Sequence, residues 1–572
     1  MLKSIEKGLF SKSFIIILLL AFFLRLYDVA KTPPSLNWDE VSLGYNAYSV
    51  LKTGKDEWGK VFPLIFQAYG DYKLPGYVYI LTPFVSLFGL NEFSVRFPSV
   101  IAGTLTVLFT YLIVKELLKN NSSSKSTENI SLLAAFLVAI EPWSLFLSRP
   151  AFEANLGLCF FVIALYLFLR SLSTLKCLPY SVLFFGLTVW SYNSYRIFTP
   201  IFMLLMFFIY RKDLKKVIKS KSFFVTSAIL MAVLFLPMFL QLITGVGQQR
   251  YRKVEIIDAG AIGQIVNLRN KYNLNPLAER LLFNRPTYFL YNFSKNIISH
   301  FSYKYLFNEG GTNYQFSVPN FRLLYKVDLI FLIIGMFYLL KLKNRASVVL
   351  LLWLLVGAVP SALTHEAPHV LRSITMLPAF MIIIAVGVCS FCDWLLSKKL
   401  GIILKFFVFL YLLILMQSLL VYLKNYFVDY RINYSWSWQY GYKEVVKYTK
   451  VNYQKYDKII ITKKYGEPHE FVLFYTPWDP NKYQNDANLI RFKQSDWFWV
   501  DRFDKFYFVN DWDIPKEEWQ PFVLESKQEE VDCQGVRCLL ITSPGNVPKG
   551  WSKLDTINFL NGSEAFEIYD NS

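Results

Sequence analysis

The stretch "SFIIILLLAFFLRLY", residues Ser13–Tyr27, is apolar at almost every position. Such a run forms a helix in lipid, where crossing takes roughly 17 to 25 residues. We expect spans at Ser13–Ala30, Pro98–Leu118, Ser131–Leu147, Asn155–Leu172, Ser181–Tyr192, Ile197–Tyr210, Phe223–Ile243, Val327–Leu342, Ser347–Leu363, Ile374–Leu396 and Ile402–Leu423. The sequence therefore predicts a polytopic α-helical membrane protein with about eleven transmembrane helices.

The composition supports the same class of protein. Of the 572 residues, 54% are hydrophobic, 18% are aromatic and only 18% are charged. A soluble chain of this length would carry far more charge on the surfaces of several domains. The formal charge of +18 is compatible with nucleic-acid binding, but much of it falls in short loops between apolar runs. We therefore expect a lipid bilayer, and no nucleic acid, among the partners.

The basic loops also predict the orientation in the membrane. They fall on one side of the predicted spans, which the positive-inside rule makes the cytoplasmic side. Their residues are Lys3, Lys7 and Lys12, then Lys115, Lys119 and Lys125, then 211–221, 341–345 and 397–399. No small-residue cleavage site follows the first run, so we expect it to stay as an uncleaved helix. The odd number of spans then predicts a multi-pass cell-membrane protein with a cytoplasmic N-terminus and an extracytoplasmic C-terminus.

The opposite side carries the long polar regions. A loop of roughly 65 residues follows the first span and one of about 80 follows the seventh, lengths that are typical of functional loops. We expect amphipathic helices in the first loop, within a membrane catalytic domain of residues 1–424. Residues 425–572 form an extracytoplasmic domain, where "KIIIT", "KFYFVN" and "CLLIT" read as strands beside a helical pattern. That alternation predicts a small α/β domain.

Six cysteines are too few for a disulfide framework. Cys389 and Cys392 stand in an apolar run, where we expect small residues of a membrane helix. Cys533 and Cys538 stand in a polar region and can pair if that region is extracytoplasmic.

Two acidic clusters stand in the first external loop. Asp39 and Glu40 are adjacent in "NWDEVSLGYN", ahead of a helix-like stretch, and Asp71 and Lys73 follow in "YGDYKLPGYVY". Adjacent carboxylates near a membrane surface serve as general base, as metal ligand, or as favourable charges at a helix N-terminus. The pattern alone leaves these three interpretations open.

Longer segments of the sequence resemble a known family. The segments "NWDE", "DYKLPGYVY…LFGLNEFSVRFPS", "SRPAFEANLGL", "SYNSYRIFTP", "NEGGTNYQFSVPNFRLLY" and "HEAPHVLRSITMLP" resemble glycosyltransferase family 39-like proteins. These include the dolichyl-phosphate-mannose protein mannosyltransferases and the lipid A aminoarabinose transferases, which share the glycosyltransferase C fold. The resemblance implies a lipid-linked sugar donor and a catalytic aspartate at Asp39. The second cluster falls on Asp71 and Lys73, where the aminoarabinose branch usually has glutamate before the lysine.

Chemistry supports the same hypothesis. Nucleotide sugars are not available outside the cytoplasm, so a donor there must be carried by the membrane, as a polyprenyl phosphate. Its phosphate needs positive charge or hydrogen-bond donors, and the attacking hydroxyl needs a carboxylate to accept its proton. We therefore expect a polyprenyl-phosphate-dependent hexosyl- or pentosyltransferase, inverting, that acts on an extracytoplasmic protein, lipid or cell-envelope glycan.

The residues expected at the site follow from these needs. Asp39 and Glu40 are the catalytic candidates, and Asp71 and Tyr195 are candidates for substrate binding. Candidates for the donor phosphate are Lys73, Arg149, Arg196, His369 and Arg372. Each of the basic residues among them is equally compatible with a side chain that anchors a helix at the membrane surface. No residue is predicted to bind a metal, and assistance by a divalent ion is left open.

The stretch "HEAPH", residues 365–369, matches the zinc-protease pattern H-E-x-x-H. That site requires both histidines on one unbroken helix, and Pro368 disfavours helix at the preceding residue. We therefore expect a short external turn, and a helix after Pro368 that places His369 and Arg372 on one face towards the donor phosphate.

Two other functions remain as alternatives. A transporter or flippase of lipid-linked sugars has a similar number of spans, but places ionisable groups near the bilayer midplane. The predicted spans have almost no charge at mid-length, which favours an enzyme acting at the membrane surface. In a membrane assembly protein, the third possibility, substitution of Asp39 would leave activity unchanged.

Overall fold

The computed structural model describes residues 11–70, 72–119, 124–218, 220–243, 249–272 and 274–571. Asp71 and the lysines Lys3 and Lys7 lie outside these residues. The chain forms two compact units. The helical unit comprises Met1–Tyr27 and Ser99–Leu423, and the α/β unit comprises Asp28–Pro98 and Lys424–Ser572. The first external loop therefore packs with the C-terminal segment, although the sequence placed it in the membrane domain.

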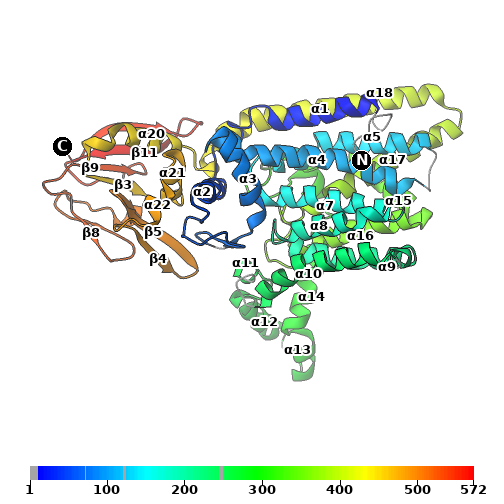
Figure 1. Ribbon diagram of the computed structural model, residues 1–572, viewed down its shortest axis with the longest axis horizontal. Coiled ribbons are helices and arrows are strands. Elements are labelled where there is room, and N and C mark those ends of the chain that lie inside the picture. The colour runs from blue at the N-terminus through cyan, green and yellow to red at the C-terminus, as the bar shows by residue number, and fades with distance from the viewer. Residues whose placement is uncertain are drawn as a thin grey trace. The chain divides into compact units, whose positions relative to one another are not determined.

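The helical unit consists of helices that pack along their lengths, among them α7 with α8 and α15 with α17 (Figure 1). The principal helices are α1 (Lys12–Leu26), α4 (Glu92–Leu118), α5 (Ser124–Ile140), α6 (Pro142–Leu147), α7 (Glu153–Ser171), α8 (Leu178–Val189), α9 (Tyr195–Ile218), α10 (Lys221–Ile243), α11 (Gln249–Arg252), α12 (Ala259–Tyr272), α13 (Pro276–Leu282), α14 (Arg285–Ser299), α15 (Asp328–Leu342), α16 (Arg345–Ala362), α17 (Leu377–Ser397) and α18 (Gly401–Lys424). Short helical turns lie at Leu175–Cys177, Lys304–Asn308 and Ile374–Met376.

All the predicted apolar runs lie largely in helices, so the prediction of a helical membrane protein is confirmed in class. Among the described residues, six helices are long and apolar enough to cross a membrane. They are Glu92–Leu118, Glu153–Ser171, Ser222–Ile243, Arg345–Ala362, Ile374–Ser397 and Gly401–Asn433. Others are shorter, such as α1 and α15 with 15 residues each. The count of eleven crossings is therefore not confirmed.

Small residues allow close helix packing inside this unit. A Cβ atom on Gly335 of α15 would lie 2.1 Å from the carbonyl oxygen of Ile383 in α17. A Cβ atom on Gly387 of α17 would lie 2.0 Å from the carbonyl oxygen of Phe331 in α15. Because lipid provides little hydrophobic drive between helices, close backbone contact of this kind is a main source of their attraction.

The α/β unit contains a seven-stranded sheet in the order β10-β11-β9-β3-β6-β5-β4. Strand β3 (Lys458–Thr462) is parallel to both neighbours, β6 (Phe506–Val509) and β9 (Cys538–Thr542). The outer strands are β4 (Ile490–Gln494), β5 (Trp497–Phe503), β10 (Ser552–Asn558) and β11 (Glu564–Asp570), and a separate pair is formed by β7 (Phe522–Val523) and β8 (Glu530–Val531). The predicted α/β domain, with strands at "KIIIT", "KFYFVN" and "CLLIT", is thus confirmed, and these three strands form the centre of the sheet.

The α/β unit also contains helices of the C-terminal segment and the elements of the first external loop. The helices of the C-terminal segment are α19 (Arg431–Asn433), α20 (Tyr442–Asn452), α21 (Pro468–Tyr475) and α22 (Pro480–Gln484). The loop contributes α2 (Trp38–Thr53), α3 (Pro75–Phe88), and a hairpin of β1 (Phe66–Gln67) and β2 (Tyr72–Lys73). Helix α2 packs on α21, where Phe474 lies against Gly44 so closely that any side chain at Gly44 would clash.

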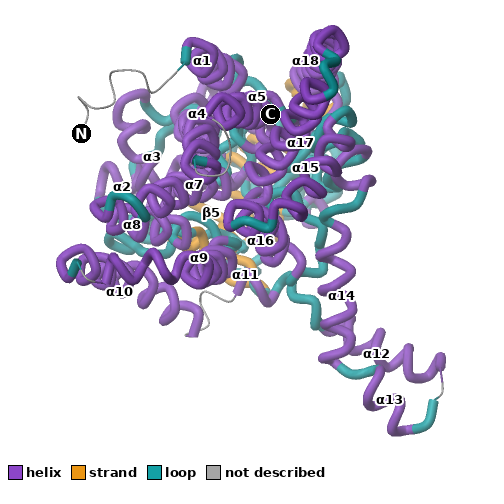
Figure 2. Tube along the Cα trace, turned by 90° about the vertical axis from the view of Figure 1, so that its right-hand side faces the viewer, coloured by secondary structure: helices purple, strands orange, loops and turns teal. Residues whose placement is uncertain are grey.

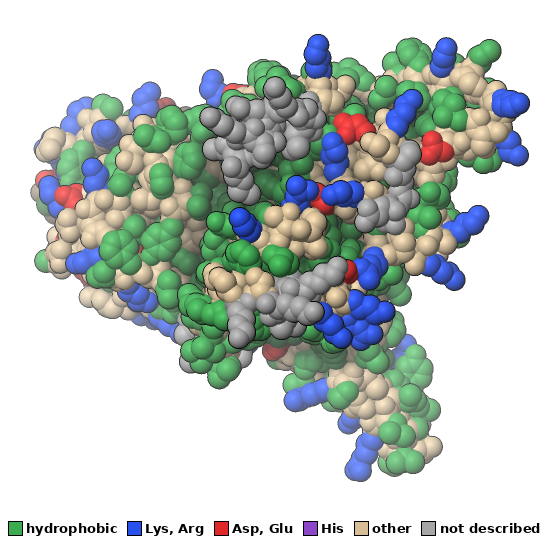
Figure 3. All heavy atoms as spheres, turned by 45° about the vertical axis from the view of Figure 1, so that its right-hand side comes forward, with side chains coloured by type: hydrophobic (Ala, Val, Ile, Leu, Met, Phe, Trp, Pro, Cys, Tyr) green, Lys and Arg blue, Asp and Glu red, His purple; other side chains and the backbone are tan. Residues whose placement is uncertain are grey.

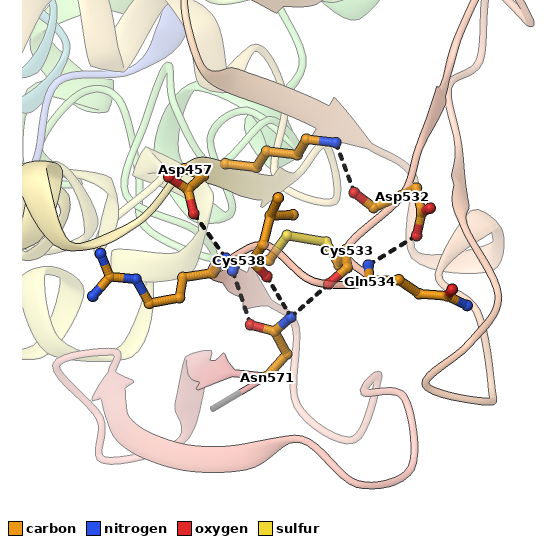
Figure 4. The surroundings of a disulfide bond; sticks show 9 residues. Asp457, Asp532, Cys533, Gln534, Cys538 and Asn571 are labelled. Carbon is orange, nitrogen blue, oxygen red and sulfur yellow. Dashed lines mark hydrogen bonds between the residues drawn. A yellow bond between two sulfur atoms is a disulfide. The ribbon is translucent and has the colours of Figure 1, made fainter.

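A disulfide joins Cys533 and Cys538, which confirms the pairing that the sequence allowed (Figure 4). Asn571 ties the two ends of this loop together: its amide donates to the carbonyl of Cys533, and its side-chain oxygen accepts from the N–H of Cys538. Cys389 and Cys392, in α17, are not disulfide-bonded.

Candidate active site

Asp39 lies in the first turn of α2, and the local sequence determines where that helix begins. The side chain of Asn37 accepts a hydrogen bond from the N–H of Glu40 at 2.9 Å, and the side chain of Glu40 accepts one from the N–H of Asn37 at 3.2 Å. This reciprocal pair is a capping box, which satisfies two N–H groups that a helix end leaves without partners. The first-turn carboxylates also interact favourably with the helix dipole.

Glu40 is buried and forms an ion pair with Arg96. Its two carboxylate oxygens lie 2.9 Å from Nε and from a terminal nitrogen of Arg96, and neither side chain is more than 1% exposed. Arg96 also donates to the carbonyl oxygens of Val29, Pro33 and Ser35. The guanidinium therefore links the backbone of residues 29–35, which precede α2, to Glu40 in the first turn of that helix. Arg96 was not among the predicted residues, although a lone arginine at the start of an apolar helix was a usable signal.

The carboxylate of Asp39 is held but not buried. Its Oδ1 atom accepts hydrogen bonds from the hydroxyl of Tyr69 at 2.6 Å and from Nζ of Lys73 at 2.5 Å. The side chain of Asp39 is 44% exposed, whereas that of Lys73 is 9% exposed. Charge-assisted hydrogen bonds of this kind orient a carboxylate and stabilise its ionised form. The carboxylate of Asp39 is therefore oriented by its partners and partly exposed.

Aromatic side chains fix the position of Tyr69. Its ring stacks on Trp497 of β5 at 5.4 Å, and Trp38 lies against both rings. The backbone carbonyl of Tyr69 accepts from the N–H of Phe498, and the indole N–H of Trp497 donates to Glu467. Strand β5 of the sheet therefore positions Tyr69, and Tyr69 in turn donates the hydrogen bond that orients Asp39. Sequence reasoning missed this contact because more than 400 residues separate the two segments.

Acidic side chains are buried where the first loop meets the sheet. Burial raises the pKa of Glu57 to about 7 and that of Glu467 to about 8. It also raises the pKa of Glu470, which shares a hydrogen bond with Glu57. Burial lowers the pKa of His469, whose Nδ1 lies 3.5 Å from Glu467. Glu57 and Glu470 come from distant segments, and their hydrogen bond requires that one of the two carboxyl groups carries a proton.

Two of the expected site residues are buried in the helical unit and donate to backbone carbonyls there. Arg149 is 1% exposed and donates to the carbonyl oxygens of Leu24, Arg25 and Tyr27, at the end of α1. Positive charge at a helix C-terminus is favourable, so Arg149 stabilises α1. Tyr195 is fully buried, and its hydroxyl donates to the carbonyl of Ala154.

Arg196 follows Tyr195 in the first turn of α9. Its guanidinium donates to the side-chain oxygen of Gln241 at 2.8 Å and lies 5.9 Å from the ring of Trp190. An apolar cavity of about 670 Å³ opens between α8, α9 and α10. Its lining includes Phe185, Pro200, Met203, Met231, Phe235 and Phe239. Arg196 and the cavity therefore belong to the same group of helices.

Residues 364–373 form turns between α16 and the helical turn at Ile374, so the helix predicted directly after Pro368 is wrong. The N–H of His369 donates to the hydroxyl of Ser361, and Arg372 pairs with Glu366 at 2.6 Å. Arg372 also donates to the hydroxyl of Thr364. These side-chain bonds hold the segment as a compact turn. His365 and His369 share no helix, so the zinc-protease geometry does not form.

The expected residues thus fall in both units. Asp39 and Lys73 form an ion pair in the α/β unit, and Glu40 is paired with Arg96 in the same unit. Arg149, Tyr195, Arg196, His369 and Arg372 belong to the helical unit. Asp71 lies outside the described residues. Within the described part of the chain, no three His, Cys, Asp or Glu side chains are grouped so as to hold a metal ion.

The chain thus combines a many-helix unit with a sheet-containing unit in which a loop presents the carboxylate of Asp39. Comparison with known proteins confirms the resemblance seen in the sequence. Residues 73–240 match the family described as dolichyl-phosphate-mannose-protein mannosyltransferase. No curated protein matches the chain in a sequence search.

Solved structures show the same fold over nearly the whole chain. ArnT from Cupriavidus metallidurans in the apo state aligns with a TM-score of 0.52 and 10% identity, over 98% of this chain and 97% of ArnT. The same protein bound to undecaprenyl phosphate aligns with a TM-score of 0.50, again at 10% identity and over the same shares of the two chains.

The archaeal oligosaccharyltransferase AglB from Archaeoglobus fulgidus, in complex with an inhibitory peptide and a dolichol-phosphate, is also similar. It aligns with a TM-score of 0.50 and 16% identity, over 81% of this chain. The chain spans 63% of the length of AglB.

Proposed function

We propose that this protein is an inverting glycosyltransferase that moves a sugar from a polyprenyl-phosphate donor to an extracytoplasmic acceptor. The observation that carries the proposal is the carboxylate of Asp39, which is 44% exposed and oriented by Lys73 and Tyr69. A side chain this exposed can contact a substrate, and its two hydrogen-bond donors keep it in the charged form that accepts a proton.

The reaction is a single displacement at the anomeric carbon of the donor. The acceptor hydroxyl oxygen forms a bond to that carbon as the bond to the phosphate oxygen breaks. The hydroxyl proton passes to Asp39, and polyprenyl monophosphate leaves with one more negative charge than it carried in the donor. Because Asp39 takes a proton and forms no bond to the sugar, the configuration at the anomeric carbon inverts. The transferred unit is a hexose or a pentose.

The helical unit supplies the groups that a lipid-linked donor needs. Arg196 and Arg372 place guanidinium groups near helix ends, where hydrogen bonds to phosphate oxygens offset the charge of the leaving group. His369 lies in the same turn as Arg372. The apolar cavity between α8, α9 and α10 accepts part of the polyprenyl chain. The similarity to ArnT, which has been solved with undecaprenyl phosphate, supports this use of the fold.

The other expected residues have supporting roles. Lys73 donates a hydrogen bond that orients the carboxylate of Asp39 and stabilises its negative charge; it does not bind the donor phosphate. The ion pair of Glu40 with Arg96 stabilises the start of α2. Arg149 and Tyr195 stabilise the helical unit. The basic loops and the disulfide support a cell-membrane location with the α/β unit outside the cytoplasm. A flippase is not favoured, because a substrate that is only moved across a membrane requires no oriented carboxylate in a surface loop.

The proposal is tested by lipid and glycan analysis in the organism that produces the protein. Cells without the protein are expected to accumulate one polyprenyl-phosphate sugar and to lose one sugar from an envelope glycan, lipid or protein. Restoring the wild-type gene reverses both changes, whereas a gene with Asp39→Asn reverses neither. If Asp39→Asn restores the wild-type pattern, the protein does not use this carboxylate for transfer.

A further inference from the structure

The inference concerns α12, α13 and α14, which we call the arm. Figures 1 and 2 show that these helices project from the rest of the helical unit and that α14 runs across the direction of α10. The arm is held together by its own contacts: Arg269 donates to the carbonyl of Phe283, and Tyr272 stacks on Phe283 at 5.5 Å. The arm is therefore a folded element with its own surface.

Helix α14 has an apolar face and a polar face. Phe289, Leu290, Phe293 and Ile297 recur at the three- and four-residue spacing that places them on one side of a helix. Asn292, Lys295 and Ser299 lie on the other side, and Asn296, seven residues after Phe289, lies at the border between the two. In a water-soluble protein the apolar side of such a helix is turned towards the core.

The side of α14 that faces the rest of the unit is mixed, because Phe289, Phe293 and Ile297 are half-buried there together with Asn296. Asn296 donates to the carbonyl oxygens of Ala362 and Thr364, at the end of α16. On the outward side Leu290 is 62% exposed and Ile298 is 70% exposed. The outward side thus exposes large apolar side chains beside the exposed Lys295, a combination that is typical of a helix lying at a membrane surface.

The other two helices extend this exposed surface. In α13, Leu277, Leu281 and Leu282 are all more than half exposed, and in α12 Ile262 and Val266 are exposed. The chain enters the arm from α10, whose last residue, Ile243, is 78% exposed and belongs to a helix apolar enough to cross a membrane. The apolar surface of the arm therefore comes shortly after an exposed apolar helix in the chain, with α11 between them.

The arm is also basic. Residues 258–299 contain five basic side chains, Arg269, Lys271, Arg280, Arg285 and Lys295, against two acidic ones, Asp258 and Glu279. Figure 3 shows hydrophobic and basic side chains together on the arm. Helices that combine a large apolar face with Lys and Arg lie in the interface of a membrane, where anionic lipids attract the basic residues.

We propose that the arm lies in the headgroup layer of the bilayer and binds anionic phospholipids. Its apolar side enters the boundary of the acyl chains, and its basic residues contact the lipid phosphates. The charge of the arm and its continuity with α10 favour a lipid surface over a protein partner. This inference does not depend on the proposed transferase activity, so the two can fail separately.

The experiment uses the full-length protein in nanodiscs of phosphatidylcholine, alone or mixed with phosphatidylglycerol. A polarity-sensitive fluorophore is attached at Leu290→Cys or Leu281→Cys, in a background in which Cys389 and Cys392 are serine. Asn267→Cys, at an exposed polar position of α12, is the matched control. We expect a blue-shifted emission, shielded from iodide, at the two leucine positions only, and stronger shielding with phosphatidylglycerol.

Charge reversal tests the role of the basic residues. The triple variant Arg280→Glu, Arg285→Glu and Lys295→Glu is expected to lose the effect of phosphatidylglycerol while the labelled leucines stay partly shielded. Emission at Leu290 like that of Asn267 in both nanodiscs would overturn the proposal, and this result needs only the labelled parent protein. Shielding that requires two copies in one disc would instead show an interface between copies and would also overturn it.

Discussion

Replacing Arg96 with methionine tests whether its buried ion pair with Glu40 stabilises the start of α2. Arg96→Met removes both bonds to Glu40 and the bonds to the carbonyls of Val29, Pro33 and Ser35, while its aliphatic chain keeps much of the volume. The cost is dominated by the carboxylate of Glu40, which is left buried without a partner. Loss of one member of a buried pair destabilises a protein by about 3–5 kcal/mol.

This energy is large enough to measure as a shift in melting temperature. A domain of 150 to 250 residues loses roughly 2–4 °C per kcal/mol, so we expect the α/β unit of Arg96→Met to melt about 6–20 °C lower. The double variant Arg96→Met with Glu40→Gln removes the unpaired charge and is expected to recover a large part of the loss. Thermal unfolding in detergent, followed by tryptophan fluorescence, measures both. A shift below about 2 °C, or a double variant no more stable than Arg96→Met, would refute this reasoning.

Three further predictions concern the site. Tyr69→Phe removes one hydrogen bond to a charged group, worth about 1.5–3 kcal/mol, so turnover should fall roughly 10- to 100-fold with donor binding kept; unchanged turnover would remove Tyr69 from the positioning of Asp39. Arg372→Ala and Arg196→Ala should each weaken binding of the donor lipid by a similar factor, and wild-type affinity in both variants would place the phosphate elsewhere. Folding raises the pKa of Glu467 from its ordinary value of 4.5 to about 8, so between these pH values the folded state keeps a proton that the unfolded state has released. The contribution of protonated Glu467 to the stability of the α/β unit should therefore be fully present below pH 4.5 and be lost as the pH rises to about 8. In Glu467→Gln the melting temperature should fall less over this pH range; an equal fall in both proteins would contradict the assignment.

Much of the fold could be predicted because hydrophobic runs report burial directly. The long runs are helices, and "KIIIT" and "CLLIT" are strands whose residues are almost all buried in the centre of the sheet. Strands β4 and β10 were missed because neither contains a buried residue and both are rich in polar residues, so that no apolar run marks them. The count of spans is not confirmed, because helices such as α15 are shorter than a full crossing.

Only those site residues that belong to a recognisable sequence motif could be predicted. Asp39 and Lys73 stand in the family pattern, and they form an ion pair in the structure. Contacts between distant segments, such as Tyr69 with Trp497, leave no trace in a single sequence. Arg149 was predicted to bind phosphate, and that prediction stays open; its hydrogen bonds to the backbone carbonyls of Leu24 and Tyr27 could not be predicted from a sequence pattern.

The most direct test of the proposed mechanism is Asp39→Asn in purified protein, with donor binding and sugar transfer measured separately. The amide keeps the shape of the side chain and an oxygen that accepts from Tyr69 and Lys73, but it cannot take the acceptor proton. Transfer should therefore fall about 10²- to 10⁴-fold, while the affinity for the polyprenyl-phosphate sugar and the melting temperature stay close to wild type. Unchanged transfer, or loss of donor binding together with transfer, would contradict a general-base role for Asp39.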